Sequence, residues 1–175
     1  MTSSNSTTTA DSTILRKFEI STREGDIIIE LFNDTPIHRD NFIKIANSDW
    51  YTNTQFHRVV PGLIIQAGDP KLRDPLDEEF LKMDKMTLPP EIKHTHFRGT
   101  LAAARRDDDV NPKRESSATQ FFINLNDNRF YDGSYTVFGR VIEGMEIVDK
   151  ISMLPRNGLD NPYNPVYLSI KEIEN

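Results

Sequence analysis

Short apolar segments, six to eight residues long and bounded by turn residues, recur along most of the chain. Such segments, rich in β-branched and aromatic residues, are typical of β-strands. Glu24-Gly25 and Pro61-Gly62 each separate two neighbouring segments and are hairpin turn signals. Eight strands are predicted, over residues 14–20, 26–32, 54–60, 63–68, 97–104, 119–124, 135–141 and 166–173. Because closure of a sheet leaves no exposed edge, so many strands favour a closed or sandwiched antiparallel sheet.

A helix is predicted after the second strand segment. Thr35 followed by Pro36 is typical of an N-cap and a first helical position, so the helix is expected to run to about Ser48. One face of this helix carries Phe42, Ile45 and Ala46. We expect that face to pack against the sheet.

Two shorter stretches also show helical spacing of apolar side chains. One covers residues 144–151. The other is DPLDEEFLKM, in which Leu76, Phe80 and Met83 fall at positions i, i+4 and i+7. This spacing predicts a short helical insertion near residues 74–86, with the three apolar side chains facing the rest of the protein.

Composition limits the chemistry that is available to the chain. Its 175 residues contain no cysteine and carry a formal net charge of −6. The lack of thiols excludes disulfides, thiolate zinc sites, iron–sulfur clusters and cysteine nucleophiles. The acidic balance weighs against nucleic-acid binding, since a polyanion binder needs a basic face. Length and apolar content predict one folded globular domain.

The two ends of the chain differ in character. Residues 1–12 are polar and without periodicity, which predicts a disordered tail before a folded domain over residues 13–175. No apolar run approaches the roughly 18–20 residues that a membrane span needs. The N-terminus lacks the basic start and apolar core of a signal peptide, so we expect a cytoplasmic protein. A mature secreted protein whose leader has been removed is the alternative.

Familiar catalytic motifs do not occur in the sequence. It contains no P-loop, no dinucleotide-binding glycine motif and no nucleophile elbow. His94 and His96 stand two residues apart and would share one face of an extended chain, so a metal pair in a metal-dependent hydrolase is one hypothesis. An ordinary loop or strand surface is the alternative.

Two polar side chains stand on otherwise apolar strand faces. Alternation places Arg58 on the face of Phe56 and Val60, and Gln66 on the face of Ile64. Burial of a guanidinium or a carboxamide without partners is costly. The pattern therefore indicates either a face turned to water or a shallow apolar groove with a few hydrogen-bond donors. Such a groove is typical of a peptide-binding or ligand-binding surface.

Three stretches resemble the signature sequences of the cyclophilin family of peptidyl-prolyl cis–trans isomerases: FHRVVPGLIIQAGD (56–69), ESSATQFFINL (115–125) and YTVFGRVIEGMEIVDKI (135–151). Residues 25–46 and 97–105 also resemble the family, in the same order along the chain. The resemblance implies a closed eight-stranded antiparallel barrel capped by two helices. It also implies a monomeric enzyme that accelerates rotation about X–Pro bonds in peptides and folding proteins, with no metal and no cofactor.

The same resemblance assigns roles to individual positions. It implies that Arg58 is the catalytic arginine, that Gln66 hydrogen-bonds the peptide backbone, and that Phe122 is the floor of the proline pocket. The further substrate-binding positions that it implies are Leu63, Ile64, Ala104, Arg105, Phe130, Tyr131 and Tyr135.

The chain also departs from the family pattern. Leu63 replaces a phenylalanine, and Arg105 replaces an asparagine that holds the substrate backbone. Phe130 stands where many members have tryptophan, so the indole N–H is missing and tight cyclosporin binding is not expected. The insertion near 74–86 replaces a glycine-rich loop and would place an acidic helix beside the groove, unless it is a neutral insertion. Leu63 and Arg105 favour the alternative function, a proline-peptide binding or scaffolding module with weak or no turnover.

Overall fold

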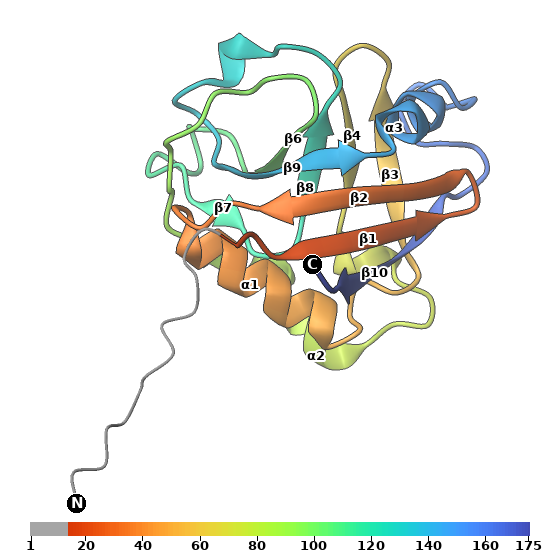
Figure 1. Ribbon diagram of the computed structural model, residues 1–175, viewed down its shortest axis with the longest axis horizontal. Helices are drawn as coiled ribbons and strands as arrows, with labels where there is room; N and C mark the ends of the chain where they lie inside the picture. Colours follow the sequence, from red (N-terminus) through yellow and green to blue (C-terminus); the bar gives the residue numbers. More distant parts are fainter. Residues whose placement is uncertain (1–13) are drawn as a thin grey trace, which may run out of the picture.

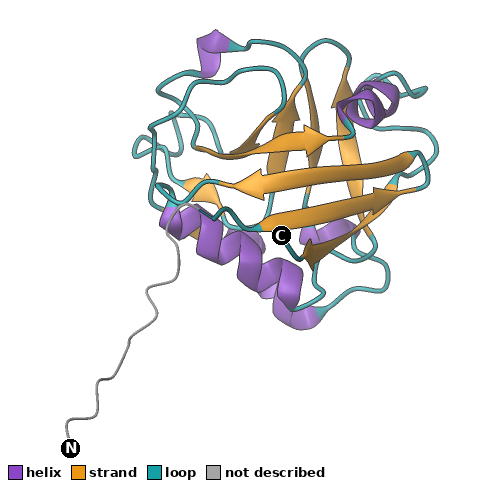
Figure 2. Ribbon diagram, in the orientation of Figure 1, coloured by secondary structure: helices purple, strands orange, loops and turns teal. Residues whose placement is uncertain are grey.

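The structure is a computed structural model and describes residues 14–175. Eight strands close into an antiparallel barrel in the order β1-β10-β3-β4-β8-β6-β9-β2 (Figures 1 and 2). The barrel strands are β1 (Lys17–Thr22), β2 (Gly25–Leu31), β3 (Thr54–Val60), β4 (Ile64–Ala67), β6 (Thr100–Ala103), β8 (Phe121–Asn124), β9 (Val137–Glu143) and β10 (Tyr167–Ile173). The closed eight-stranded barrel predicted from the sequence is confirmed. The predicted tail over residues 1–12 lies outside the described residues.

The two faces of the barrel wall carry two separate apolar clusters. On β4, β8 and β6, the paired residues Ile65, Ile123 and Leu101 are fully buried in the barrel interior. Because side chains alternate along a strand, the next residues point outward. Phe122 and Ala102 are such neighbours, and they join a second cluster on the outside of the wall. The barrel interior is thus the core, and the outer face of β4, β8 and β6 is apolar as well.

Two helices lie on opposite sides of the barrel (Figure 1). The helix α1 (Pro36–Asn47) buries Phe42, whose ring contacts those of Phe18, Tyr51, Phe121 and Phe138. The helix α3 (Met145–Ser152) contacts β2, β3 and β4 and buries Val148 and Ile151. Both predicted helices are confirmed, and both pack their apolar face against the barrel.

A side chain from a distant segment caps the N-terminus of α1. Thr35 holds the N-cap position, as predicted, but its side chain makes no capping hydrogen bond. The backbone N–H groups of Ile37 and His38 donate instead to the Glu91 carboxylate, at 3.2 and 2.8 Å. The His38 ring joins this carboxylate, at 2.7 Å, to the Ser116 hydroxyl, at 2.8 Å. Glu91 therefore stabilises the helix terminus, where a negative charge is favourable.

We expect Glu91→Ala to lower the free energy of unfolding by about 2–3 kcal/mol, since it leaves buried donors without an acceptor and removes a helix cap. The Glu91 side chain is only 8% exposed, so water cannot readily replace it. Urea unfolding measures this loss of stability, and the m-value should be the same as in wild type. Glu79→Ala is the control, because it removes an exposed ion pair with Lys82 and should change stability by less than about 0.5 kcal/mol. Equal effects of the two substitutions would contradict this account of the cap.

The predicted helical insertion is present but shorter than the apolar spacing indicated. The helix α2 spans Glu78–Leu81 and continues as a 3-10 turn, η2 (Lys82–Lys85). The Asp77 carboxylate accepts a hydrogen bond from the Phe80 N–H at 3.0 Å and so begins the helix later than expected. Phe80 is buried as predicted, but Leu76 lies before the cap and is 59% exposed. Its assignment to the buried face was wrong.

Two short strands stand beside the barrel. They are β5 (Thr87–Leu88), which follows the insertion, and β7 (Ser116–Ser117), and they pair antiparallel to each other. The remaining 3-10 turns are η1 (Pro70–Leu72) and η3 (Arg129–Tyr131). This arrangement brings the end of the insertion next to the segment that leads into β8.

Candidate functional site

A β-bulge decides where Arg58 points. Phe56 pairs with Ala67 and Arg58 pairs with Gln66, so two steps along β3 oppose one step along β4. Phe56 is buried in the barrel interior, whereas Arg58 stands opposite Gln66 on the outer face. A bulge adds one residue to a strand and thereby reverses the alternation. The prediction that Arg58 shares a face with Phe56 was therefore wrong, whereas Val60 does share the face of Arg58.

The register of the sheet places four residues in one row across neighbouring strands. Arg58 of β3 pairs with Gln66 of β4, Gln66 pairs with Phe122 of β8, and Phe122 pairs with Ala102 of β6. Directly paired side chains on one face of a sheet are close enough to interact. The guanidinium, the carboxamide and the aromatic ring that were predicted to act together thus lie side by side.

Phe122 is the centre of a cluster of aromatic rings on the outer face of the barrel wall. Its ring stacks on that of His96, with centroids 6.0 Å apart and planes at 10°. Tyr131 and Tyr135 stand edge-on to Phe122, at 5.8 and 5.5 Å, and 5.0 Å from each other. The aliphatic residues of the same cluster are Ile64, Ala102 and Val137, with Val60, Leu63 and Ala104 packed against them. This cluster, which we call the recess, is therefore apolar and has rings on several sides of Phe122.

His96 is the buried support of this recess, a role that was not predicted. The neutral ring donates from Nε2 to the Tyr135 carbonyl at 3.3 Å, and its Nδ1 accepts from the Asn124 amide at 3.1 Å. The side-chain oxygen Oδ1 of Asn124 accepts in turn from the Asn128 side-chain amide, at 2.9 Å. Burial lowers the pKa of His96 and favours this uncharged form. The only sequence signal for this hydrogen-bond network is the position of Asn124 on β8. It lies two residues after Phe122, the ring that His96 supports.

Acidification is expected to destabilise the fold through its buried histidines. Burial lowers the pKa of His38, His57 and His96 below the ordinary value of 6.5. Because the unfolded chain binds these protons more readily, unfolding takes up protons as the pH falls below about 6.5. The free energy of unfolding should then fall by up to about 1.4 kcal/mol per pH unit for each histidine that stays neutral in the fold. Urea unfolding between pH 7.5 and 5.5 tests this, and a stability that does not fall over that range would contradict it.

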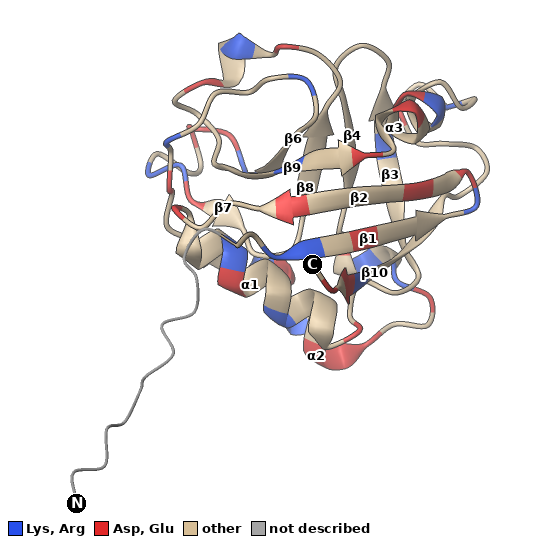
Figure 3. Cartoon of the chain, viewed as in Figure 1, with Lys and Arg blue, Asp and Glu red and all other residues tan. Residues whose placement is uncertain are grey.

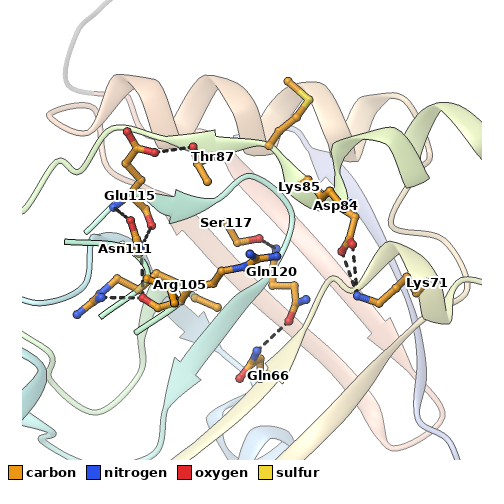
Figure 4. A pocket seen from close by; sticks show the side chains of 14 residues that line it. Gln66, Lys71, Asp84, Lys85, Thr87, Arg105, Asn111, Glu115, Ser117 and Gln120 are labelled. Atoms are coloured by element: carbon orange, nitrogen blue, oxygen red, sulfur yellow. Dashed lines mark hydrogen bonds and ion pairs between the residues drawn. The ribbon is translucent and has the colours of Figure 1, made fainter. Parts of the chain in front are cut away.

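A groove of about 650 Å³ lies beside the recess (Figure 4). Gln66, Ala104 and Arg105 line it, together with residues 84–87 at the end of the insertion and residues of the segment 110–117. Its charged lining residues are Lys71, Lys85, Arg105, Arg106, Asp84 and Glu115. Figure 3 shows the helix α2 coloured red by its acidic residues, Glu78 and Glu79. Neither of them is among the residues that line the groove. The insertion therefore supplies a wall of mixed charge, in which Asp84 is paired with Lys71, rather than an acidic face.

Gln66 and Arg105 have different surroundings within this groove. The Gln66 side-chain amide donates to the side-chain oxygen Oε1 of Gln120 at 2.9 Å (Figure 4). The Arg105 guanidinium donates to the Ser134 and Arg106 carbonyl groups, pairs with Asp108 at 2.8 Å, and lies 4.8 Å from the centre of the Tyr135 ring. Its side chain is only 6% exposed. Arg105 therefore supports the wall of the recess and has few donors left for a peptide.

Phe130 is the predicted binding residue that the structure leaves outside the recess. It is 68% exposed and contacts the Tyr131 ring at 4.4 Å. The other predicted residues lie in the row, in the recess or along the groove. Their individual roles stay predictions, but the fold brings them together at one place.

His94 and His96 do not form a metal pair. The His94 Nε2 atom lies 2.7 Å from the Asp34 carboxylate, and its ring packs on Phe32, whereas His96 binds Asn124. Among residues 14–175, no three His, Cys, Asp or Glu side chains are grouped so that they could hold a metal ion. The metal-dependent hydrolase hypothesis thus has no site in the described part of the chain. Over the same residues, no helix is both long enough and apolar enough for a membrane crossing.

Comparison with known proteins agrees with this geometry. A family model described as cyclophilin type peptidyl-prolyl cis-trans isomerase/CLD matches residues 17–174. A peptidyl-prolyl cis-trans isomerase of Acinetobacter baylyi is 40% identical over 149 residues, which cover 78% of this chain and 72% of that protein. The peptidyl-prolyl cis-trans isomerase-like 3 of Dictyostelium discoideum is 36% identical over 151 residues, covering 85% and 89%.

A solved structure shows the same architecture. The crystal structure of a cyclophilin type peptidyl-prolyl cis-trans isomerase from Cryptosporidium parvum matches with a TM-score of 0.80 at 27% identity, over 93% of this chain and 99% of that one. Barrel, site and relatives together define a class, the isomerases of X–Pro peptide bonds. Within that class, the chain belongs to the cyclophilin-type peptidyl-prolyl cis–trans isomerase family.

Proposed function

We propose that the chain isomerises X–Pro bonds by holding the proline ring in the recess of Phe122 while Arg58 donates a hydrogen bond to the prolyl nitrogen. Rotation about the peptide bond faces a barrier of about 18–20 kcal/mol, because it breaks the amide resonance. As the bond twists, the nitrogen lone pair is freed and becomes a hydrogen-bond acceptor. A donor aimed at that nitrogen stabilises the twisted state more than either planar state, which lowers the barrier.

The position and availability of Arg58 support this role most directly. Arg58 stands next to Gln66 in the row that leads to Phe122. Burial and Tyr135 raise the pKa of Tyr131, while the charge of Arg58 acts in the opposite direction, which is consistent with a guanidinium close to the recess. Within the described residues, no hydrogen bond or ion pair engages the Arg58 guanidinium. Its several N–H donors are thus available to a ligand, unlike those of Arg105.

The remaining residues of the site hold the peptide. Phe122, Ile64 and Leu63, with Tyr131 and Tyr135, present apolar surface to the proline ring. Gln66 and Ala104 stand where the recess meets the groove and are suited to hold the backbone before the proline. The groove then takes the residues that precede the proline. No step of this reaction needs a nucleophile or a proton transfer.

One observation favours a second candidate, a module that binds proline peptides with little turnover. The N–H donors of Arg105 are used within the protein. Arg105 therefore cannot make the contact with the substrate backbone that the resemblance assigns to an asparagine at this position. Weaker positioning of the backbone lowers turnover more than it lowers binding of the proline ring.

Exchange NMR on an Ala-Pro peptide separates the two candidates. With the full chain present at substoichiometric concentration, we expect exchange cross-peaks between the cis and trans forms of the peptide, which uncatalysed rotation over tens of seconds or longer does not give. Chemical-shift titration of the protein measures binding in the same samples. Binding without enhanced exchange would show the module and contradict the proposed activity.

A further inference from the structure

The bulge that turns Arg58 outward needs partners from outside the sheet. A bulged residue leaves backbone groups without their usual ladder bonds. At this point β10 pairs with only the first two residues of β3, so the His57 carbonyl before Arg58 and the Val59 N–H after it find no ladder partner on that edge. Regular alternation from Phe56, which is buried in the barrel, would carry Arg58 into the interior as well. Whatever holds these two peptide groups therefore holds Arg58 in its outward position.

A loop that is distant in the sequence provides both partners. The segment 153–166 joins α3 to β10 and reaches the bulge with Asp160 and Asn161. The Val59 N–H donates to the Asp160 carbonyl at 2.8 Å. The Asn161 side-chain amide donates to the His57 carbonyl, also at 2.8 Å. The two peptide groups that flank Arg58 are thus both bound by consecutive residues of one loop.

The loop is itself fixed by internal hydrogen bonds. The Asn157 side-chain oxygen accepts from the backbone N–H groups of Leu159 and Asn161, at 2.9 and 3.1 Å. The Asn157 N–H donates to the Asn161 carbonyl at 2.9 Å, and an isolated β-bridge joins Arg156 to Pro162. Asp160 has a φ of 64°, a left-handed conformation that costs energy for a residue other than glycine. The tip of the loop is thus held in the shape that presents its carbonyl and its amide to β3.

We infer that Asn161 is a positioning residue for Arg58, acting through the His57–Arg58 peptide group and supported by the Asp160 carbonyl. This inference rests on the proposed function, in which Arg58 donates to the prolyl nitrogen. A catalytic group must be held within a fraction of an ångström of its productive position. The loop achieves this without contact with the substrate, because it binds the backbone of β3 rather than the guanidinium.

Asn161 allows a sharp test because its donor is a side chain. Asn161→Ala removes the donor, and Asn161→Asp keeps the shape but places a carboxylate oxygen against the His57 carbonyl. Leu159→Ala is the matched control, since Leu159 lies in the same loop, is 78% exposed and takes part in the loop's hydrogen bonds through its backbone N–H, which alanine keeps. The two Asn161 variants disturb the loop differently, so one of them remains informative when the other is unstable.

The first readout is kinetic. We expect both Asn161 variants of the full chain to lower kcat for an Ala-Pro peptide about tenfold with KM changed less than twofold, and Leu159→Ala to behave as wild type. The double variant Arg58→Ala/Asn161→Ala should be no slower than Arg58→Ala alone, because the two residues act on one step. Additive losses in the double variant, or an Asn161→Ala variant as active as Leu159→Ala, would overturn the inference.

The second readout does not depend on activity. In the free protein, the Val59 amide should exchange with solvent faster in the Asn161 variants than in wild type or Leu159→Ala, and the Arg58 Nε–H signal should shift or broaden. The Arg58→Ala spectrum identifies that signal. If Arg58→Ala leaves isomerisation intact, the proposed function fails, yet these two signals still report whether the loop holds the bulge. Unchanged signals in both Asn161 variants would refute the positioning role by themselves.

Discussion

Arg58→Ala is expected to lower kcat/KM for an X–Pro peptide by about 100- to 1,000-fold while the protein stays folded. This is the range for removal of one hydrogen-bond donor that acts mainly in the transition state. The side chain lies on the outer face of β3 and outside the barrel core, so its loss leaves the interior packing unchanged. A coupled assay with a protease that cleaves only the trans peptide measures the rate.

Arg58→Lys is the informative companion to this variant. Lysine keeps the positive charge but lacks the planar fork of the guanidinium, so we expect an activity between those of wild type and Arg58→Ala. Urea unfolding of all three proteins should give similar midpoints, which would assign the loss to the site rather than to the fold. Near wild-type turnover by Arg58→Ala would refute the proposed mechanism.

Phe122→Ala is the prediction with the second largest effect, and it acts on binding. We expect KM for a proline peptide to rise at least about tenfold, because the floor of the recess is lost and its wall of rings is left without support. Phe122 is 3% exposed, so the free energy of unfolding should also fall by about 3–5 kcal/mol. Titration of the peptide, followed by NMR, measures binding independently of turnover.

Two further variants separate binding from stability. Phe122→Leu keeps most of the apolar volume and should lower the free energy of unfolding by less than about 1.5 kcal/mol. Its peptide binding can therefore be measured in a well-folded protein. Phe97→Ala removes an aromatic ring that is 50% exposed and stands outside the recess, and it should leave KM unchanged. A wild-type KM for both Phe122 variants would show that the proline ring binds elsewhere.

The elements that could be predicted from the sequence depend on local signals. Alternating apolar segments indicated the eight barrel strands, and the buried face around Phe42 and Ile45 indicated α1. Resemblance to a known family added expected roles for Arg58, Gln66 and Phe122, which strand alternation alone could not assign; the variants above test those of Arg58 and Phe122. Pairing then placed these three residues in one row, since the register of a sheet is set by the residues that must face its interior.

The features that could not be predicted depend on contacts between distant segments. Glu91 caps α1 from 53 residues away, and no local pattern marks it as a cap. At the bulge that separates Phe56 from Arg58, the His57 carbonyl is bound by Asn161, about a hundred positions further along the chain. His96 was considered as a metal ligand because of its neighbour His94, but its partner is Asn124. In each case a polar group meets a backbone or side chain that only the closed barrel brings near.

In the proposed mechanism, the claim to be tested is that Arg58 stabilises the twisted peptide bond rather than binding the peptide. Exchange NMR with an Ala-Pro peptide, at protein concentrations that saturate it, gives the rate of isomerisation on the protein, and titration gives Kd. For Arg58→Ala we predict a Kd within about threefold of wild type and an on-protein rate that is lower by at least about 100-fold. An unchanged on-protein rate, with the whole loss of activity explained by a weaker Kd, would contradict the claim.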